Sequence, residues 1–255
     1  MKAALYTLLA TLMTSVAGTA QEKFDVRIVR DTRNDFGLSY NFFAGDDLDD
    51  FRTTIKGFGS GFLLDVFSGR FSKDILWIGT ESVNLTVGAG AAISKYRFSE
   101  PVIFFEENGE YFYTLDDDPA HSYGNGFFSG DKSKMVIGSF IFPANINFDL
   151  GKFYLSTGGF LDVYLAGMHK LKYTVDGDRR KEVIRNDKFN DFPINKTKWG
   201  LGAMLMHKQS GVSAGVTYML TPFFKENTAF PEMREVRVSF SYDLSLFDGK
   251  KKKFK

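Results

Sequence analysis

The segment VRVSFSYDLS, residues 236–245, alternates apolar and polar side chains without exception. Because successive side chains of a β-strand point to opposite faces, this pattern predicts a strand with one apolar and one polar face. A tilted strand of about 10 residues is long enough to cross a bilayer when it belongs to a closed barrel. The segment therefore suggests a membrane-spanning barrel strand, a reading that depends on whether the rest of the chain repeats the pattern.

Two-faced segments of this kind recur along the chain. The alternation is clear at residues 83–94, 198–205 and 212–221, weaker at 36–42 and 57–66, and two further segments at 135–148 and 153–168 complete a set of eight. The sequence thus predicts an all-β fold, a transmembrane antiparallel up-and-down β-barrel of about eight strands.

The connections between these segments alternate in length. Short links are expected at residues 68–74, 149–152 and 207–211, and longer ones at 45–53, 100–132, 169–197 and 225–232. Outer-membrane barrels join their strands by short periplasmic turns and longer external loops. This order therefore predicts that both termini lie on the periplasmic side.

The N-terminal residues indicate export. Lys2 and an apolar run over residues 3–16 precede the small residues AGTA at 17–20, which predicts a signal peptide over residues 1–20 with cleavage after Ala20. We expect an N-terminal periplasmic segment at 21–34, an outer-membrane β-barrel at 35–247 and a basic C-terminal tail at 248–255. The predicted location is the cell outer membrane.

Composition excludes several classes of protein. The chain contains no cysteine, so neither a lipoprotein anchor nor a disulfide scaffold is available. Basic and acidic residues number 32 and 31, and removal of Lys2 with the signal peptide balances them. Nothing in this balance predicts a nucleic-acid partner.

The polar faces of the predicted strands distinguish a membrane barrel from a soluble one. A soluble exported lipocalin-like barrel that binds an apolar ligand needs a charged outer face, whereas the polar faces here consist mainly of Gly, Ser, Thr and Ala. Small residues suit a narrow lumen, and buried charges must be paired. We therefore predict a lumen charge network formed by Asp65, Asp162, Lys198, Arg237 and Asp243.

Two further expectations concern particular residues. Aromatic residues at the strand ends are candidates for a girdle at the level of the lipid headgroups: Trp77, Tyr96, Phe98, Tyr154, Tyr164, Tyr173, Phe223 and Phe224. Pro143 lacks the amide that a ladder needs, so we expect a bulge or a strand end near it.

One pair of segments carries a family resemblance. The stretch IGSFIFPANINF at 137–148, a tight turn, and FYLSTGGFLDVY at 153–164 resemble the PorT-like outer-membrane β-barrel family of Bacteroidota, in which a strand with a central proline precedes a strand of the form aromatic-x-x-x-x-Gly. The resemblance covers residues 36–246 and implies a barrel with a part in protein secretion. The C-terminus departs from many outer-membrane barrels, because Phe247 is followed by Asp248, Gly249 and a lysine tail.

Residues suited to catalysis are few and scattered. His121, His169 and His207 fall in an external loop, at an outer strand end and at a periplasmic turn, so they are not expected to converge. The best arrangement for a surface hydrolase is His121 beside the acidic run at 116–118, or His169 alone. No catalytic, metal-binding or cofactor-binding residue is predicted, and the expected cofactor is none.

The functional prediction is a non-enzymatic barrel with a structural or envelope-interaction role. Its external loops, residues 100–132 and 169–197, would contact envelope or secretion proteins, and its other partners would be outer-membrane lipid and the barrel-assembly machinery during insertion. One alternative is a narrow channel or small-solute transporter sensitive to Asp162 and Arg237. Others are an outer-membrane surface hydrolase and the soluble lipocalin-like barrel.

Overall fold

The computed structural model describes residues 23–28, 34–45, 66–98, 101–108, 110–123, 132–184, 194–226, 230 and 232–244. Within these residues the chain forms twelve β-strands. They are β1 (Asp25–Ile28), β2 (Asn34–Ala44), β3 (Val66–Gly79), β4 (Val83–Arg97), β5 (Val102–Glu107), β6 (Glu110–Leu115), β7 (Lys132–Leu150), β8 (Phe153–Val175), β9 (Asp178–Ile184), β10 (Thr197–His207), β11 (Val212–Met219) and β12 (Arg234–Asp243).

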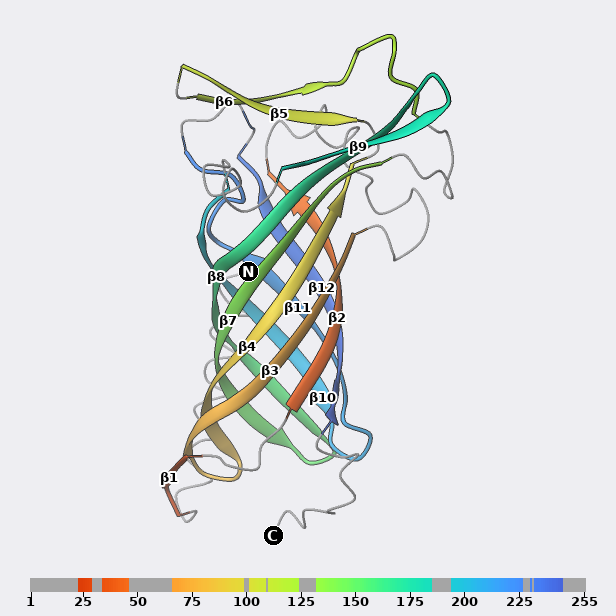
Figure 1. Cartoon of the computed structure of the whole chain (residues 1–255). Coiled ribbons are helices and arrows are strands. Elements are labelled where there is room, and N and C mark those ends of the chain that lie inside the picture. The colour runs from red at the N-terminus through yellow and green to blue at the C-terminus, as the bar shows by residue number, and fades with distance from the viewer. Residues whose placement is uncertain are drawn as a thin grey trace.

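Eight of these strands close into an antiparallel barrel (Figure 1). The ring runs β3, β2, β12, β11, β10, β8, β7 and β4, and the pairing of β4 with β3 closes it. The prediction of an all-β up-and-down barrel of about eight strands is confirmed. β1, from the predicted N-terminal segment, pairs with the far end of β3.

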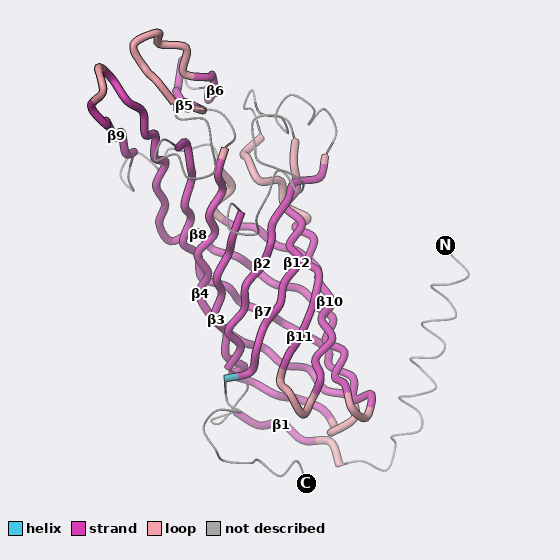
Figure 2. The backbone as a smooth tube through the Cα atoms, turned by 90° about the vertical axis from the view of Figure 1, so that its right-hand side faces the viewer, coloured by secondary structure: helices cyan, strands magenta, loops and turns pink. Residues whose placement is uncertain are grey.

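The barrel has two unlike ends (Figure 2). Tight turns at residues 80–82, 151–152 and 208–211 join strands at one end, where Gly151 and Gly211 adopt positive φ values of 76° and 69°. Long connections leave the other end and carry the separate hairpin β5–β6 and the strand β9, which pairs with β8. The short links predicted at 149–152 and 207–211 are confirmed.

The first part of the chain differs from the prediction. The expected short link at 68–74 lies inside β3, and the actual turn follows it at residues 80–82. The polar residues that suggested a turn line the interior instead: Ser72 is buried, and Asp74 borders the internal cavity. Most of the strand predicted at 57–66 lies outside the described residues, as do the signal peptide at 1–20 and the tail at 248–255.

The two faces of the barrel are reversed relative to those of a soluble protein. Polar side chains fill the interior, whereas large apolar side chains cover the outside, as on β12, where Ser239 and Ser241 are buried and Phe240 is 61% exposed. Exposed apolar residues of the same kind lie around the barrel: Phe36, Leu38, Phe71, Leu85, Ile93, Phe140, Phe142, Ile146, Leu161, Leu165, Trp199, Leu201, Leu205, Val212 and Val216.

Charged residues are rare on this apolar outer face. Among the described residues of the eight barrel strands, Lys73 on β3 lies within this face, and four lysines lie towards the loop-side ends of their strands: Lys95, Lys134, Lys170 and Lys172. A lysine stem packs along apolar surface while its ammonium reaches a polar region. The face is therefore a nearly continuous apolar belt that contains Lys73 and is bordered by lysines on its loop side.

Pro143 does not end or bulge β7, contrary to the prediction. β7 continues to Leu150, and the β4–β7 ladder is interrupted between the pairs Val87–Ala144 and Gly90–Ile141 without a change of register. A Cβ atom at Gly88 would lie 3.1 Å from Cγ of Pro143. The glycine therefore gives the proline ring room where the ladder is interrupted.

No α-helix among the described residues is both long enough and apolar enough to span a membrane.

Candidate functional site

A layer of charged side chains crosses the lumen towards its long-loop end, with Glu235 at its centre. Arg237 donates to Glu235 Oε2 at 2.8 Å and pairs with Asp162 at 2.7 Å, and Lys198 Nζ lies 3.4 Å from the same Oε2 of Glu235. Tyr96 and Asn41 each donate a hydrogen bond to Glu235 Oε1, at 2.7 and 2.6 Å. Two cations and two carboxylates from β8, β10 and β12 thus balance within the barrel.

The structure brings together three of the five residues predicted for the lumen network. Asp162, Lys198 and Arg237 form the charged layer, whereas Asp243 is buried further along β12 towards the turns. Asp65 lies outside the described residues. Each charged side chain in the layer needs a partner, because burying an unpaired charge in a medium of low dielectric constant costs free energy.

Glu235 was not among the predicted residues, although it has the most partners in the layer. Its side chain is 1% exposed. The signal was present in the sequence, since Glu235 shares the alternation of Arg237 and immediately precedes the segment that identified the strand. Extending that strand by one residue would have found it.

A polar cavity of about 70 Å³ lies on the turn side of this layer. Arg237 and Asp162 border it, together with small polar residues of several strands: Ser39, Ser72, Thr86, Asn145, Asn147, Ser156, Thr217 and Ser239. A volume of this size accommodates a few water molecules. This cavity, lined by residues within the described ranges, is therefore too small for a larger solute.

Near the turns, hydrogen bonds between lumen-facing side chains join three neighbouring strands. Asn147 donates to Asn84 at 2.9 Å and to Thr86 at 3.1 Å, and Ser156 donates to Asn147. These four residues come from β4, β7 and β8. This hydrogen-bond network holds β4, β7 and β8 together at the turn-side end of the barrel.

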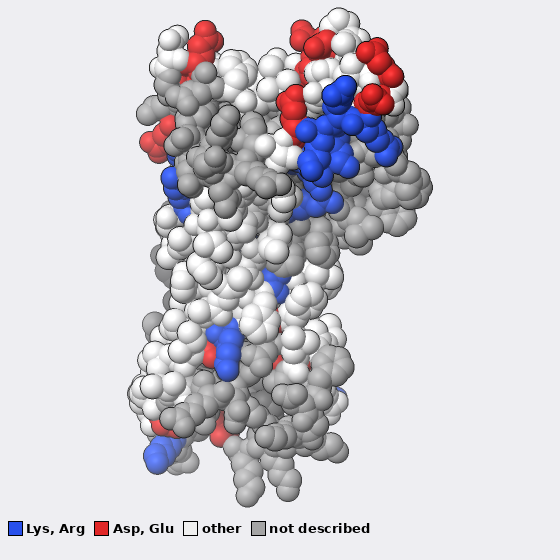
Figure 3. All heavy atoms as spheres, viewed as in Figure 1, with Lys and Arg blue, Asp and Glu red and all other residues white. Residues whose placement is uncertain are grey.

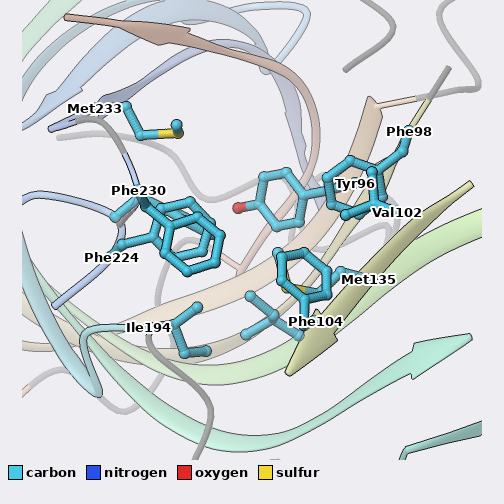
Figure 4. Packing of buried hydrophobic residues seen from close by; sticks show 11 residues of the cluster. Tyr96, Phe98, Val102, Phe104, Met135, Ile194, Phe224, Phe230 and Met233 are labelled. Carbon is cyan, nitrogen blue, oxygen red and sulfur yellow. The ribbon is translucent and has the colours of Figure 1, made fainter. Parts of the chain in front are cut away.

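An aromatic cluster closes the other side of the charged layer (Figure 4). Phe223 packs at ring-centroid distances of 5.1 Å from Tyr96 and 5.0 Å from Phe43, and Lys198 lies over its ring at 4.8 Å. The cluster joins barrel strands to the long connections, and its buried members are Tyr96, Phe98, Val102, Phe104, Met135, Ile137, Ile194, Phe223, Phe224, Phe230 and Met233.

This cluster corrects the predicted aromatic girdle. Tyr96, Phe98, Phe223 and Phe224 are buried inside the closure, and Tyr173 is also buried. The alternation explains the first of these, because Tyr96 follows the lumen-facing Ser94 on β4 and so points inwards. These four rings, which the sequence assigned to the lipid surface, instead cover the mouth of the barrel.

His169 is buried rather than available for catalysis. Its Nε2 lies 3.2 Å from the Ser133 hydroxyl, which also donates to the Val102 carbonyl at 3.1 Å. Both side chains are at most 3% exposed, and the Phe104 ring lies edge-on to the imidazole at 4.9 Å. A substrate has no route to this serine–histidine pair, which ties β7 to β8.

His121 forms an external contact with Asp116, as the sequence allowed. Its Nδ1 lies 2.6 Å from Asp116 Oδ2, and its ring stacks on Tyr173 of β8 at 3.8 Å. The hydrogen bond that the imidazole donates to Asp116, followed by the charge of that carboxylate, raises the pKa of His121 above the ordinary 6.5. Tyr123 also donates to Asp116. The contact fastens the segment after β6 to the β8–β9 hairpin.

His207 is distant from both, at the end of β10, where its Nδ1 lies 3.0 Å from the hydroxyl of Ser210 in the following turn. The three histidines therefore do not converge. No group of three or more His, Asp or Glu residues within the described ranges is arranged to hold a metal ion.

Comparison with known proteins gives a distant structural likeness. The fold is similar to the crystal structure of Ail, the attachment invasion locus protein of Yersinia pestis, with a TM-score of 0.32 and 13% sequence identity, over 83% of this chain and 96% of that one. No protein-family model matches the chain, and no curated protein matches it. The resemblance to PorT-like proteins stays a prediction.

Proposed function

We propose that this protein is a non-enzymatic barrel of the bacterial outer membrane, with a closed lumen and with external hairpins that contact other components of the cell envelope. The observation that carries the proposal is the reversal of its two faces. Ser, Thr, Asn and charged residues are buried in the barrel, while Phe, Leu, Ile, Val and Trp cover its outside.

The free-energy cost of exposing so many apolar side chains to water supports a position of the barrel in lipid. Burying one large apolar side chain stabilises a protein by about 1.5–3 kcal/mol, and the outer face forgoes this gain at more than a dozen positions. Monomeric soluble proteins rarely expose contiguous apolar patches of this extent. A lipocalin-like barrel in water would present the opposite pattern.

Strand lengths and connection lengths support an orientation. In the proposal the tight turns and both termini face the periplasm, and β5, β6 and β9 face outwards, as is usual for outer-membrane barrels. The signal peptide predicted at residues 1–20 supports export through the inner membrane. Insertion would then require lipid and the barrel-assembly machinery.

The closed mouth favours a structural or contact role over transport. The aromatic cluster and the charged layer both cross the lumen, and an eight-stranded barrel is filled by its own side chains. The candidate contact surfaces are the hairpins β5–β6 and β8–β9. Resemblance to PorT-like proteins supports protein secretion as the process that these contacts serve.

A narrow channel is the second candidate, and the polar cavity beside Asp162 and Arg237 favours it. Conductance across a planar bilayer distinguishes the two. We expect no single-channel steps from the wild-type chain and steps from a Phe223→Ala variant, in which the closure has lost a central ring. Steady wild-type conductance that changes in Asp162→Asn would support the channel instead.

Placement in the membrane can be tested with the two tryptophans of the chain. In a Trp77→Phe variant Trp199 is the remaining tryptophan, and its side chain is 55% exposed on the outer face of β10. After folding into vesicles, its fluorescence should be quenched by lipids brominated on their acyl chains. Failure of quenching, together with recovery of the protein in the soluble fraction, would overturn the proposal.

Orientation can be tested with single cysteines, because the natural chain has none. Lys181→Cys lies on β9, and its matched control, Lys152→Cys, lies in the exposed turn between β7 and β8. On intact cells a membrane-impermeant maleimide should label the first and not the second. The reverse result would invert the proposed orientation, and labelling of both would show that the chain is not confined to the membrane.

A further inference from the structure

The outer face of the sheet formed by β7, β8 and β9 carries a basic surface made of Lys134, Lys170, Lys172, Arg179 and Lys181. In Figure 3 the blue side chains gather over the upper ends of these strands. The acids of β9, Asp178 and Glu182, alternate with this set and so lie on the opposite face of the sheet. The basic surface is therefore uniform in sign.

The register places like charges directly opposite each other. Lys134 of β7 pairs with Lys170 of β8, and Lys172 of β8 pairs with Lys181 of β9. Directly opposed residues have Cβ atoms about 5 Å apart, and like charges in such pairs destabilise a sheet. An anion bound between the members of each pair would reduce this repulsion and stabilise the sheet.

Protection of an exposed sheet edge does not account for these lysines. Edge strands often carry lysine to prevent pairing with other chains. Lys134, Lys170 and Lys172, however, belong to β7 and β8, and each of these strands has a neighbour on both sides in the sheet order. Only Lys181 and Arg179 lie on β9, which pairs with β8 alone among the described strands.

The position of the basic surface along the barrel axis indicates which anion it binds. On β7 the outward residues from Val136 to Leu150 are uncharged, and Lys134 follows at once on the loop side. At about 3.4 Å per residue and a tilt of about 40°, this stretch rises about 35 Å, close to the thickness of a hydrocarbon core with its boundary. The lysines thus begin where the acyl chains end.

We propose that this basic surface binds the phosphate groups of lipid headgroups in the outward leaflet, one phosphate between each opposed pair of lysines. The inference rests on the proposed membrane placement and specifies the lipid class that the barrel prefers. A lysine beside an anionic membrane surface changes partitioning about fivefold, which corresponds to about 1 kcal/mol. A phosphate shared by two lysines also relieves their repulsion.

Hydrogen exchange of the folded chain tests the proposal, since residues 168–184 report on the β8–β9 hairpin locally. The protein is folded into phosphatidylcholine vesicles with and without phosphatidylglycerol, and insertion is checked by the difference in gel migration between unheated and boiled samples. We expect exchange in 168–184 to be slower by about fivefold with phosphatidylglycerol, and unchanged in the turn at 208–211.

A pair of variants with equal change of charge makes the result specific. Lys170→Gln with Lys172→Gln should abolish the effect of phosphatidylglycerol on 168–184, whereas Lys23→Gln with Lys152→Gln, both exposed and remote from the surface, should preserve it. Equal exchange in the two vesicles, or an unchanged effect in the first variant, would overturn the inference.

Two further outcomes distinguish a wrong choice of anion from a wrong membrane placement. Heparin added to phosphatidylcholine vesicles should not slow exchange in 168–184; if it does so as strongly as phosphatidylglycerol, the surface binds a soluble polyanion and the lipid inference is wrong. A chain that shows no insertion in either vesicle contradicts the membrane placement itself. In that case the proposed function falls together with the inference.

Discussion

The two halves of the lumen are filled by different types of side chain. On the turn side, small polar residues surround a cavity and are joined by hydrogen bonds such as those of Asn147. On the loop side, aromatic rings pack around Phe223, and the charged layer centred on Glu235 lies between the two halves. The contrast indicates that closure of the barrel depends on the loop side, whereas the turn side tolerates water.

The most damaging single change should be Glu235→Ala. It leaves Lys198 and Arg237 with Asp162 as their remaining acid in the layer and removes the acceptor of Tyr96 and Asn41. Removing one partner from a buried ionic group costs about 3–5 kcal/mol. The free energy of unfolding in urea, followed by tryptophan fluorescence in vesicles, measures the loss.

A matched control uses the second glutamate of the same region. Glu232 pairs with Arg234 at the surface, with its side chain 63% exposed, and exposed pairs contribute at most about 1 kcal/mol. Glu232→Ala should therefore be close to neutral. Equal losses in the two variants would refute the central role of Glu235.

Phe223→Ala should have the next largest effect, a loss of about 3 kcal/mol, because it leaves a cavity among rings that cannot collapse onto it. The control is Phe105→Ala, whose ring is 40% exposed and stacks on Phe112 outside the cluster. The same unfolding measurement compares them. If the Phe223 variant were as stable as the control, the aromatic cluster would not be the element that closes the barrel.

On the turn side, Asn147→Ala should cost less, about 1–2 kcal/mol. It removes hydrogen bonds to Asn84 and Thr86, but the adjoining cavity admits water that can replace them. A loss as large as that of Glu235→Ala would erase the proposed difference between the two halves.

The smallest effect concerns the external contact of His121 and its dependence on pH. Since Asp116 raises the pKa of His121 above 6.5, the stabilisation is fully present below 6.5 and is lost as the pH rises through the raised value. Hydrogen exchange in residues 116–123 should accelerate over that interval. His121→Gln should show a flat profile, and a wild-type profile that is equally flat would rule out the charged pair.

Strict alternation allowed most of the barrel to be predicted, because each lumen-facing residue has an apolar neighbour that faces outwards. The method failed where this contrast is weak. Ser72 and Asp74 looked like turn residues, yet they face the lumen from the middle of β3. A short polar run such as Ser72-Lys73-Asp74 carries the same local signal in a turn and in a strand with a polar lumen face, and only the pairing partner on β4 decides between them.

The candidate site was predicted in part for a related reason. Asp162, Lys198 and Arg237 stood out as charges on faces otherwise made of small residues, whereas Glu235 lay just outside the recognised segment. The inward direction of Phe223 could not be read from sequence, because it lies in a long connection without periodicity. Its position depends on where that connection returns over the barrel mouth.

The strand β8 continues well past the rim of the barrel, so the β8–β9 hairpin projects beyond the other barrel strands. From Met168, near the last outward apolar position, to Val175 at the end of the strand, the chain rises roughly 15–20 Å if the tilt persists. In the proposed membrane placement, the acidic tip at Asp176 and Asp178 therefore lies in water above the lysines at its base. The proposed lipid contact at the base and a proposed contact of the tip with an envelope component would then occupy different parts of the hairpin.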